Sequence, residues 1–109
     1  MVGGLVRNLR TLKAARDAQG RKLDIVVMSD PVDIRSRSRN FVPSYANYYV
    51  CNGAVIAAEF GDDTTDAAAK ETLLRLYPGR EVISLNIDPI GEAGGGIHCA
   101  TQQQPKRAA

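Results

Sequence analysis

The dipeptide Asn52-Gly53 constrains the fold of this chain more than any other feature. Both residues adopt positive φ angles easily, and this pair is the strongest short-range sequence signal for a tight β-hairpin. β-forming runs flank it, Tyr45–Val50 on one side and Ala54–Ala58 on the other. The sequence therefore predicts an antiparallel hairpin in the middle of the chain.

A helix and a further strand are predicted to follow the hairpin. Gly61-Asp62-Asp63-Thr64 offers a turn and helix-capping side chains, and its acidic residues suit the positive end of a helix dipole. The apolar stripe of this helix is formed by Ala69, Leu73, Leu76 and Tyr77. Pro78-Gly79 ends the helix, and Glu81–Ile87 is a strand that Asp88-Pro89 ends. These elements make one ββαβ unit.

The beginning of the chain predicts the second half of a similar unit. Leu5, Leu9 and Leu12 recur at helical spacing, and we expect Gly20 to be the C-cap of this helix. Leu23–Met28 is an apolar, β-branched run, which predicts a strand that is mostly buried. We therefore expect an α/β chain of the α+β kind, with about one and a half ββαβ modules.

Composition limits the classes of function. The chain has 109 residues, enough for one domain, and its net charge of +2 is too small to indicate a nucleic-acid or membrane partner. No apolar run reaches the ~20 residues that a membrane-spanning helix needs. Two cysteines form no CxxC pair, and the single histidine leaves a Cys/His zinc site short of a ligand. We expect a cytoplasmic protein with reduced thiols and without a metal or other cofactor.

The strongest chemical signal is the segment from Gly94 to Cys99, Gly-Gly-Gly-Ile-His-Cys. Glycines let a loop approach a small ligand closely, so we expect Gly95 and Gly96 to bind a substrate through their backbone atoms. A cysteine in a flexible polar loop suits a nucleophile, because the thiolate is the attacking form. We predict that Cys99 is catalytic, whereas Cys51 at a strand end is expected to be a small buried hydrophobic residue.

The polar neighbours of Cys99 have other interpretations. His98 is adjacent, but neighbouring side chains in an extended segment point to opposite sides, which makes it a poor general base for Cys99. We expect the His98 side chain to be packed or hydrogen-bonded behind the loop. The run Gln102-Gln103-Gln104 is expected to anchor the loop or to line the pocket.

Phosphate and RNA binding are disfavoured. The glycine run lacks the spacing of a phosphate-binding loop. Arg35, Arg37 and Arg39 alternate with serine in an aperiodic stretch without interleaved aromatic residues, so no platform for base stacking is present. A solvated surface loop is the favoured interpretation of this stretch.

The segment Gly94–Pro105, Gly-Gly-Gly-Ile-His-Cys-Ala-Thr-Gln-Gln-Gln-Pro, resembles the terminal active-site signature of agmatine deiminases. These enzymes belong to the bacterial peptidylarginine deiminase-like family. Further stretches that resemble the family are Pro43–Tyr49, Asn52–Ile56, Phe60–Asp62 and Tyr77–Val82, so the resemblance covers most of the chain. It implies the pentein fold, a fan of ββαβ modules around a pseudo-fivefold axis that carries the active site.

The resemblance also implies hydrolysis of a guanidinium C–N bond. By this analogy Cys99 attacks the guanidinium carbon, ammonia leaves, and water cleaves the covalent thiouronium intermediate. Agmatine would give N-carbamoylputrescine, a step of putrescine biosynthesis. Full-length members carry their proton-transferring histidine and substrate carboxylates upstream, and neither is matched here. Residues 1–109 are therefore expected to be the C-terminal portion of a deiminase whose upstream modules are absent.

Two classes of function stay open at this point. One is a deiminase piece that acts when another polypeptide supplies the missing modules, on agmatine, free arginine or peptidyl arginine. The other is a non-catalytic remnant or binding module that keeps the pentein pieces. In either case we expect self-association or a partner, because half a fan leaves apolar module faces uncovered.

Overall fold

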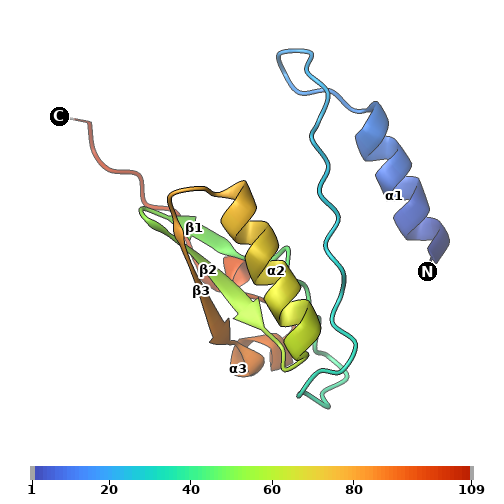
Figure 1. Ribbon diagram of the computed structural model, residues 1–109, viewed down its shortest axis with the longest axis vertical. Helices are drawn as coiled ribbons and strands as arrows, with labels where there is room; N and C mark the ends of the chain where they lie inside the picture. The colour runs from blue at the N-terminus through green and yellow to red at the C-terminus, as the bar shows by residue number, and fades with distance from the viewer. Residues whose placement is uncertain (1, 109) are drawn as a thin grey trace.

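The computed structural model describes residues 2–108 as a three-stranded mixed sheet with surrounding helices (Figure 1). The elements in chain order are α1 (Val2–Ala14), β1 (Tyr49–Cys51), β2 (Ala54–Glu59), α2 (Asp63–Leu76), β3 (Glu81–Asn86), α3 (Asp88–Glu92) and the 3-10 turn η1 (His98–Ala100). β2 is the central strand, antiparallel to β1 and parallel to β3. α2 connects the parallel strands and covers one face of the sheet. The predicted ββαβ unit is thus present as one module.

The predicted hairpin forms at Asn52-Gly53. Gly53 has a φ of +76°, a conformation that residues with side chains rarely adopt, and β1 pairs with β2 directly across this turn. β1 begins at Tyr49, later than predicted. The residues before it form a separate turn, in which the backbone N–H of Asn47 donates to the Ser44 carbonyl oxygen at 3.3 Å.

α2 begins and ends where its capping residues predict. Asp62 is the N-cap, and its carboxylate accepts a hydrogen bond from the Thr65 backbone N–H at 3.3 Å. Tyr77 ends the helix, and Gly79 then turns the chain with a φ of +85°, so that β3 runs parallel to β2. Leu73 is fully buried and holds the apolar face of α2 against the sheet.

The hydrophobic core joins the module to the segments that flank it. Its largest fully buried side chains are those of Phe60, Leu73 and Val55. Phe41 and Ile97 lie outside the module in sequence, yet both pack into the same cluster as Phe60. A Cβ at Gly91 would collide with the Phe41 ring, so glycine lets α3 approach that ring. Apolar contacts therefore fix both the segment before β1 and the cysteine loop to the module.

One arginine of the predicted solvated loop is part of the packed structure. Arg35 pairs with Asp88 (Nε to Oδ2, 3.1 Å) and donates to the last carbonyl oxygen of β2 at 2.7 Å. A Cβ at Gly61 would meet Arg35 Cγ at 2.5 Å, so the arginine stem occupies that space. The hydrogen bond to Asp88 raises the pKa of the Arg35 guanidinium. Arg37 and Arg39 are exposed, as the sequence predicts.

The N-terminal region differs most from its prediction. α1 ends before Gly20, which is not its C-cap but lies in a turn closed by a bridge between Arg16 and Lys22. Residues 23–28 form no strand with any part of the described chain, and Val27 is 76% exposed. A strand requires a neighbour for its backbone hydrogen bonds, and the described strands supply none here. The prediction of a mostly buried strand is therefore wrong for these residues.

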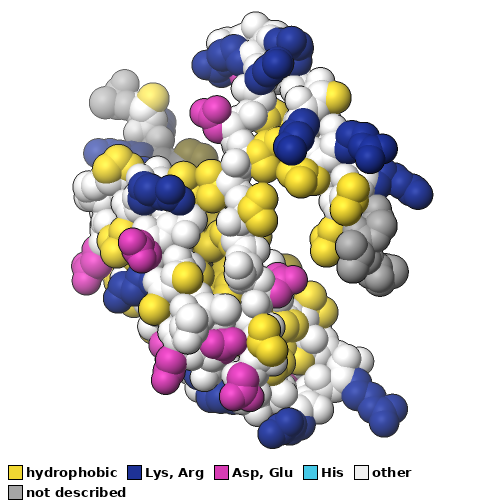
Figure 2. Space-filling view, turned by 45° about the vertical axis from the view of Figure 1, so that its right-hand side comes forward, with side chains coloured by type: hydrophobic (Ala, Val, Ile, Leu, Met, Phe, Trp, Pro, Cys, Tyr) yellow, Lys and Arg dark blue, Asp and Glu magenta, His cyan; other side chains and the backbone are white. Residues whose placement is uncertain are grey.

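The N-terminal helix is set apart from the sheet. Figure 1 shows α1 separated from the module by the long extended segment that follows it. In Figure 2 a deep notch divides the two parts, and hydrophobic side chains lie on both of its sides. Leu5 and Leu12 of α1 are 65% and 45% exposed. Exposed apolar surface of this kind normally marks a face that another element covers. None of the helices within residues 2–108 is long and apolar enough to cross a membrane.

Candidate active site

Cys99 lies in the 3-10 turn η1, on the loop that follows α3. Gly94 turns the chain out of α3 with a φ of +95°, a conformation that would strain any side chain. Ile97 is buried and fixes the loop to the core. Cys99 itself is exposed. The loop thus presents a thiol at the surface on a base that the core holds in place.

Asn47 connects the Cys99 thiol to the turn before β1. Its Nδ2 donates to Cys99 Sγ at 3.4 Å, and its Oδ1 accepts from the His98 backbone N–H at 2.8 Å. A Cβ at Gly96 would collide with the Asn47 amide, so glycine at this position makes room for it. Sequence reasoning missed Asn47 as a site residue because it lies 52 residues from Cys99 along the chain. Its place in a segment that resembles the deiminases was the one available signal.

The hydrogen bond from Asn47 is the largest cause of a lowered pKa of the Cys99 thiol. The backbone amide of Gly96 lowers this pKa further, while desolvation opposes both. These donors stabilise the thiolate, which is the nucleophilic form. Cys51 has a different environment: it is half-buried at the end of β1, and its thiol donates to the Ala54 carbonyl oxygen at 3.5 Å. The environment that favours a reactive thiol is therefore that of Cys99.

The turn that carries Asn47 is anchored on α2. Tyr45 is buried, and its hydroxyl donates to the Asp66 carboxylate at 2.6 Å. The same carboxylate accepts the backbone N–H groups of Phe60 and Gly61 at 2.9 and 3.1 Å. Burial and the bond to Asp66 raise the pKa of Tyr45, so its hydroxyl keeps its proton and remains a donor. The first turn of α2 thus positions Asn47 through Tyr45.

His98 occupies an environment that differs from its prediction. It lies in η1 rather than in an extended segment, and it is exposed rather than packed behind the loop. Its backbone N–H makes the bond that ties the loop to Asn47. The Gln103 amide donates to the Val50 carbonyl oxygen at 3.3 Å, which anchors the segment after the cysteine loop to β1. None of the residues Gln102–Gln104 lines the hollow in front of Cys99.

The Cys99 thiol faces an open hollow of about 360 Å³. Its lining residues are Ser44, Ala46, Asn47, His98 and Cys99. None of these is a carboxylate, the group that normally pairs with a guanidinium cation. A Cβ at Gly95 would meet Cys99 Cβ at 3.2 Å. The missing side chain of Gly95 therefore leaves room for Cys99, as that of Gly96 does for Asn47. Substrate contacts from the backbone of Gly95 and Gly96 stay a prediction.

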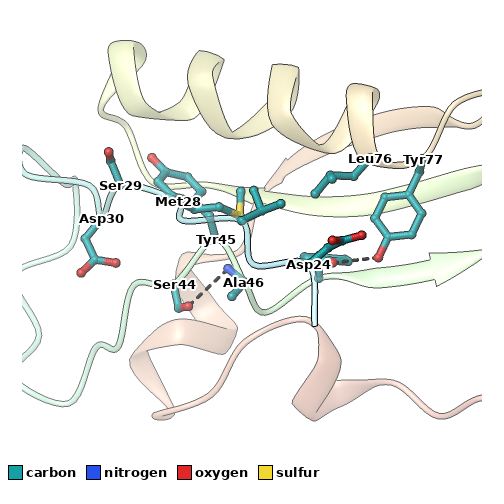
Figure 3. Close-up of a pocket in the computed structure, with 11 residues that line it drawn as sticks. Asp24, Met28, Ser29, Asp30, Ser44, Tyr45, Ala46, Leu76 and Tyr77 are labelled. Carbon is teal, nitrogen blue, oxygen red and sulfur yellow. Dashed lines mark hydrogen bonds between the residues drawn. The ribbon is translucent and has the colours of Figure 1, made fainter. Parts of the chain in front are cut away.

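A larger hollow, of about 530 Å³, lies between the N-terminal region and the module (Figure 3). Asp24 and Asp30 line it, but Figure 3 places them at opposite ends. The hydroxyls of Tyr48 and Tyr77 share a hydrogen bond at 2.8 Å, and burial together with this bond raises the pKa of Tyr48 to about 12. Cys99 is not part of this lining. Acidic side chains thus form neither a pair beside the thiol nor, within residues 2–108, a cluster suited to a metal ion.

Known proteins resemble this chain over most of its length. Residues 3–105 match the family model described as Porphyromonas-type peptidyl-arginine deiminase. The agmatine deiminase of Pseudomonas aeruginosa is 40% identical over 115 residues, covering 89% of this chain and 31% of that protein. The agmatine deiminase structure from Enterococcus faecalis superposes with a TM-score of 0.83 at 26% identity, over 93% of this chain and 32% of that one.

These similarities bear on both fold and length. The ββαβ module and its likeness to the deiminase structures confirm the expected fold, a partial pentein of about one and a half modules. Of the expected half module the structure contains the helix α1, whereas residues 23–28 form no strand. The chain spans 27–31% of the length of curated relatives that it matches.

Proposed function

This chain belongs to the Porphyromonas-type peptidyl-arginine deiminase family, and we propose that it carries the nucleophile of a guanidine deiminase. The observation that supports this most is the pairing of Cys99 with Asn47, which gives an exposed thiol a fixed N–H donor. Relatives named agmatine deiminase favour agmatine as the substrate. N-carbamoylputrescine and ammonia are then the products.

The proposed reaction begins at the Cys99 thiolate. The sulfur attacks the guanidinium carbon and forms a C–S bond, after which a C–N bond breaks and the nitrogen, having taken up a proton, leaves as ammonia. Water then adds to the thiouronium carbon and gives up two protons as the C–S bond breaks, so that the thiolate returns and the ureido product leaves. One of these protons replaces the proton that the departing nitrogen took up, and the other converts ammonia to the ammonium ion. A guanidinium ion and water together give a urea and an ammonium ion, so atoms and charge balance. No step requires an oxidant or a cofactor.

The remaining groups of the site would come from residues outside this chain. Turnover needs carboxylates for the guanidinium and a group that moves protons, yet the hollow at Cys99 is lined by no carboxylate. α1 and residues 23–28 expose apolar side chains, and the chain covers only 31% of the Pseudomonas relative. The remainder of a deiminase would cover this surface and complete the site. A second copy of the chain is the alternative occupant.

A non-catalytic binding module is the second candidate function. The absence of a carboxylate from the lining of the Cys99 hollow favours it, because such a site could bind without turnover. We propose that the protein is cytoplasmic, because Cys51 and Cys99 are unpaired thiols and that compartment keeps thiols reduced.

Ammonia release from agmatine and from arginine tests the proposal, with the purified chain and its Cys99→Ser variant. We expect negligible turnover by the chain alone, because acid–base catalysis is worth about 10²–10⁴-fold and lost positioning costs more. Robust release that Cys99→Ser abolishes would support the nucleophile but contradict the need for other residues. Release that survives Cys99→Ser would refute the nucleophile.

A further inference from the structure

We propose that Asn47 is the positioning residue that makes the Cys99 thiol reactive. Its amide oxygen holds the cysteine loop in place, and its amide nitrogen donates to the sulfur. This inference rests on Cys99 as the nucleophile of the proposed function. It adds the group that favours the thiolate and fixes where the sulfur lies.

The orientation of the Asn47 amide follows from its two partners. The His98 backbone N–H can only donate, so the amide oxygen must face it, at 2.8 Å. The amide NH₂ group is then left facing Cys99 Sγ, at 3.4 Å. A flipped amide would place two donors against each other at the His98 contact. One side chain therefore anchors the loop and solvates the thiolate at once.

The Asn47 side chain has little room to leave this position. It is half-buried, and Gly96 packs so closely that a Cβ there would collide with its amide. Tyr45, two residues earlier, is buried and tied by its hydroxyl to Asp66 on α2. The donor is thus held in place before any substrate binds. A preorganised donor of this kind stabilises a developing or full negative charge without a cost of reorganisation.

Within the described chain, the lining of the Cys99 hollow contains few titratable groups that could also shift the pKa of the thiol. The hollow in front of Cys99 is lined by one further titratable side chain, that of His98, and by the uncharged Ser44, Ala46 and Asn47. The loop behind the thiol is formed by Gly95 and Gly96, which carry no side chains. The amide of Asn47 is therefore the side-chain group that donates directly to Sγ.

Substitution of Asn47 can separate its two contacts. Asn47→Asp is nearly isosteric and keeps an acceptor for the His98 N–H, but it replaces the donor to Sγ with a negatively charged oxygen. Asn47→Ala removes both contacts. Gly96→Ala leaves Asn47 in the sequence but pushes its amide out of place. Asn8→Asp is the matched control, because it makes the same change at an exposed position of α1.

The measurement is the rate at which iodoacetamide alkylates Cys99 in the whole chain, followed by peptide mapping across a range of pH. Loss of the donor and addition of a like charge both disfavour the thiolate, so we expect Asn47→Asp to raise the pH midpoint by about one unit or more. At pH 7 the rate should fall about threefold per unit, because a thiolate of higher pKa is scarcer but more nucleophilic. Gly96→Ala and Asn47→Ala should shift the midpoint in the same direction, and Asn8→Asp should not shift it.

An unchanged midpoint in Asn47→Asp, with unchanged thermal unfolding, would overturn the proposal. If Asn47→Asp does not fold, the folded Asn47→Ala or Gly96→Ala variant decides, and an unchanged midpoint there refutes the role of Asn47. The alkylation assay needs no deiminase turnover. A shifted midpoint without any deiminase activity in a completed enzyme would therefore retain the role of Asn47 while rejecting the proposed function.

Discussion

The ββαβ module and the N-terminal region have equally clear sequence patterns, yet only in the module do all the predicted helices and strands form. In the module, β2 lies between two partner strands and α2 covers the sheet. In the N-terminal region, residues 23–28 have no partner strand in the described chain. Val55 of β2 is fully buried whereas Val27 is 76% exposed, although both lie in apolar runs. A local sequence pattern can favour an extended backbone, but the segment becomes a packed strand only where a partner strand lies beside it.

The largest expected contrast between the two regions is in core stability. Leu73→Ala removes a fully buried side chain of α2, so we expect it to lower the free energy of unfolding by about 2–5 kcal/mol. Leu5→Ala, the same substitution on α1, removes a side chain that is 65% exposed and should change it by less than about 0.5 kcal/mol. Urea denaturation followed by circular dichroism measures both. Equal losses in the two variants would show that α1 is packed as tightly as α2.

A smaller contrast in stability is expected between substitutions of two aspartates, Asp66 in the module and Asp17 in the N-terminal region, whose carboxylates accept hydrogen bonds from nearby residues. Asp66→Asn should lower the free energy of unfolding by about 1–3 kcal/mol, because an NH₂ group would then oppose N–H or O–H donors that the carboxylate accepts. Asp17→Asn breaks only an exposed ion pair with Arg21 in the N-terminal turn, so it should barely move the unfolding midpoint. Thermal unfolding at neutral pH compares the two variants. A larger loss for Asp17→Asn would reverse our ranking of the two regions.

The smallest expected effect concerns the contact between Asp62 of the module and the backbone of Val32 and Asp33, which follow the N-terminal region. The Asp62 carboxylate accepts the backbone N–H groups of Val32 and Asp33 at 2.9 and 3.3 Å, and these bonds hold its pKa below the ordinary 3.8. A carboxyl whose pKa is lower when folded stabilises this contact above its unfolded pKa, and this contribution is lost as pH falls through the folded pKa.

The amide proton shifts of Val32 and Asp33, followed by NMR as a function of pH, measure this contact. We expect them to titrate with a midpoint below 3.8 and to lose their dispersion in acid before the amides of β2 do. Asp62→Asn should abolish this titration while leaving β2 folded. A midpoint at or above 3.8 would mean that Asp62 does not hold the N-terminal region to the module.

The sequence predicts contacts between residues that are close along the chain more accurately than contacts between residues that are far apart along it. Asn52-Gly53 and Asp62 act on their immediate neighbours, and the hairpin and the start of α2 lie where these residues predict. Cys99 is likewise predicted from the local pattern of its glycine loop, and its role as the nucleophile stays a prediction. The contact between Asn47 and Cys99 spans 52 residues and depends on how the module packs, so no local pattern reveals it. Residues 23–28 show the opposite error, since a clear local pattern did not guarantee a partner.

A chimeric enzyme tests the central claim most directly, because it supplies the residues that we propose this chain lacks. In it, the matched region of the Pseudomonas aeruginosa agmatine deiminase, 40% identical over 115 residues, is replaced by this chain. We predict that the chimera converts agmatine to N-carbamoylputrescine with release of ammonia. Cys99→Ser should abolish this activity, and the matched control Cys51→Ser should retain it. A folded chimera without activity, or activity that survives Cys99→Ser, would contradict the claim that this chain supplies the nucleophile of a deiminase.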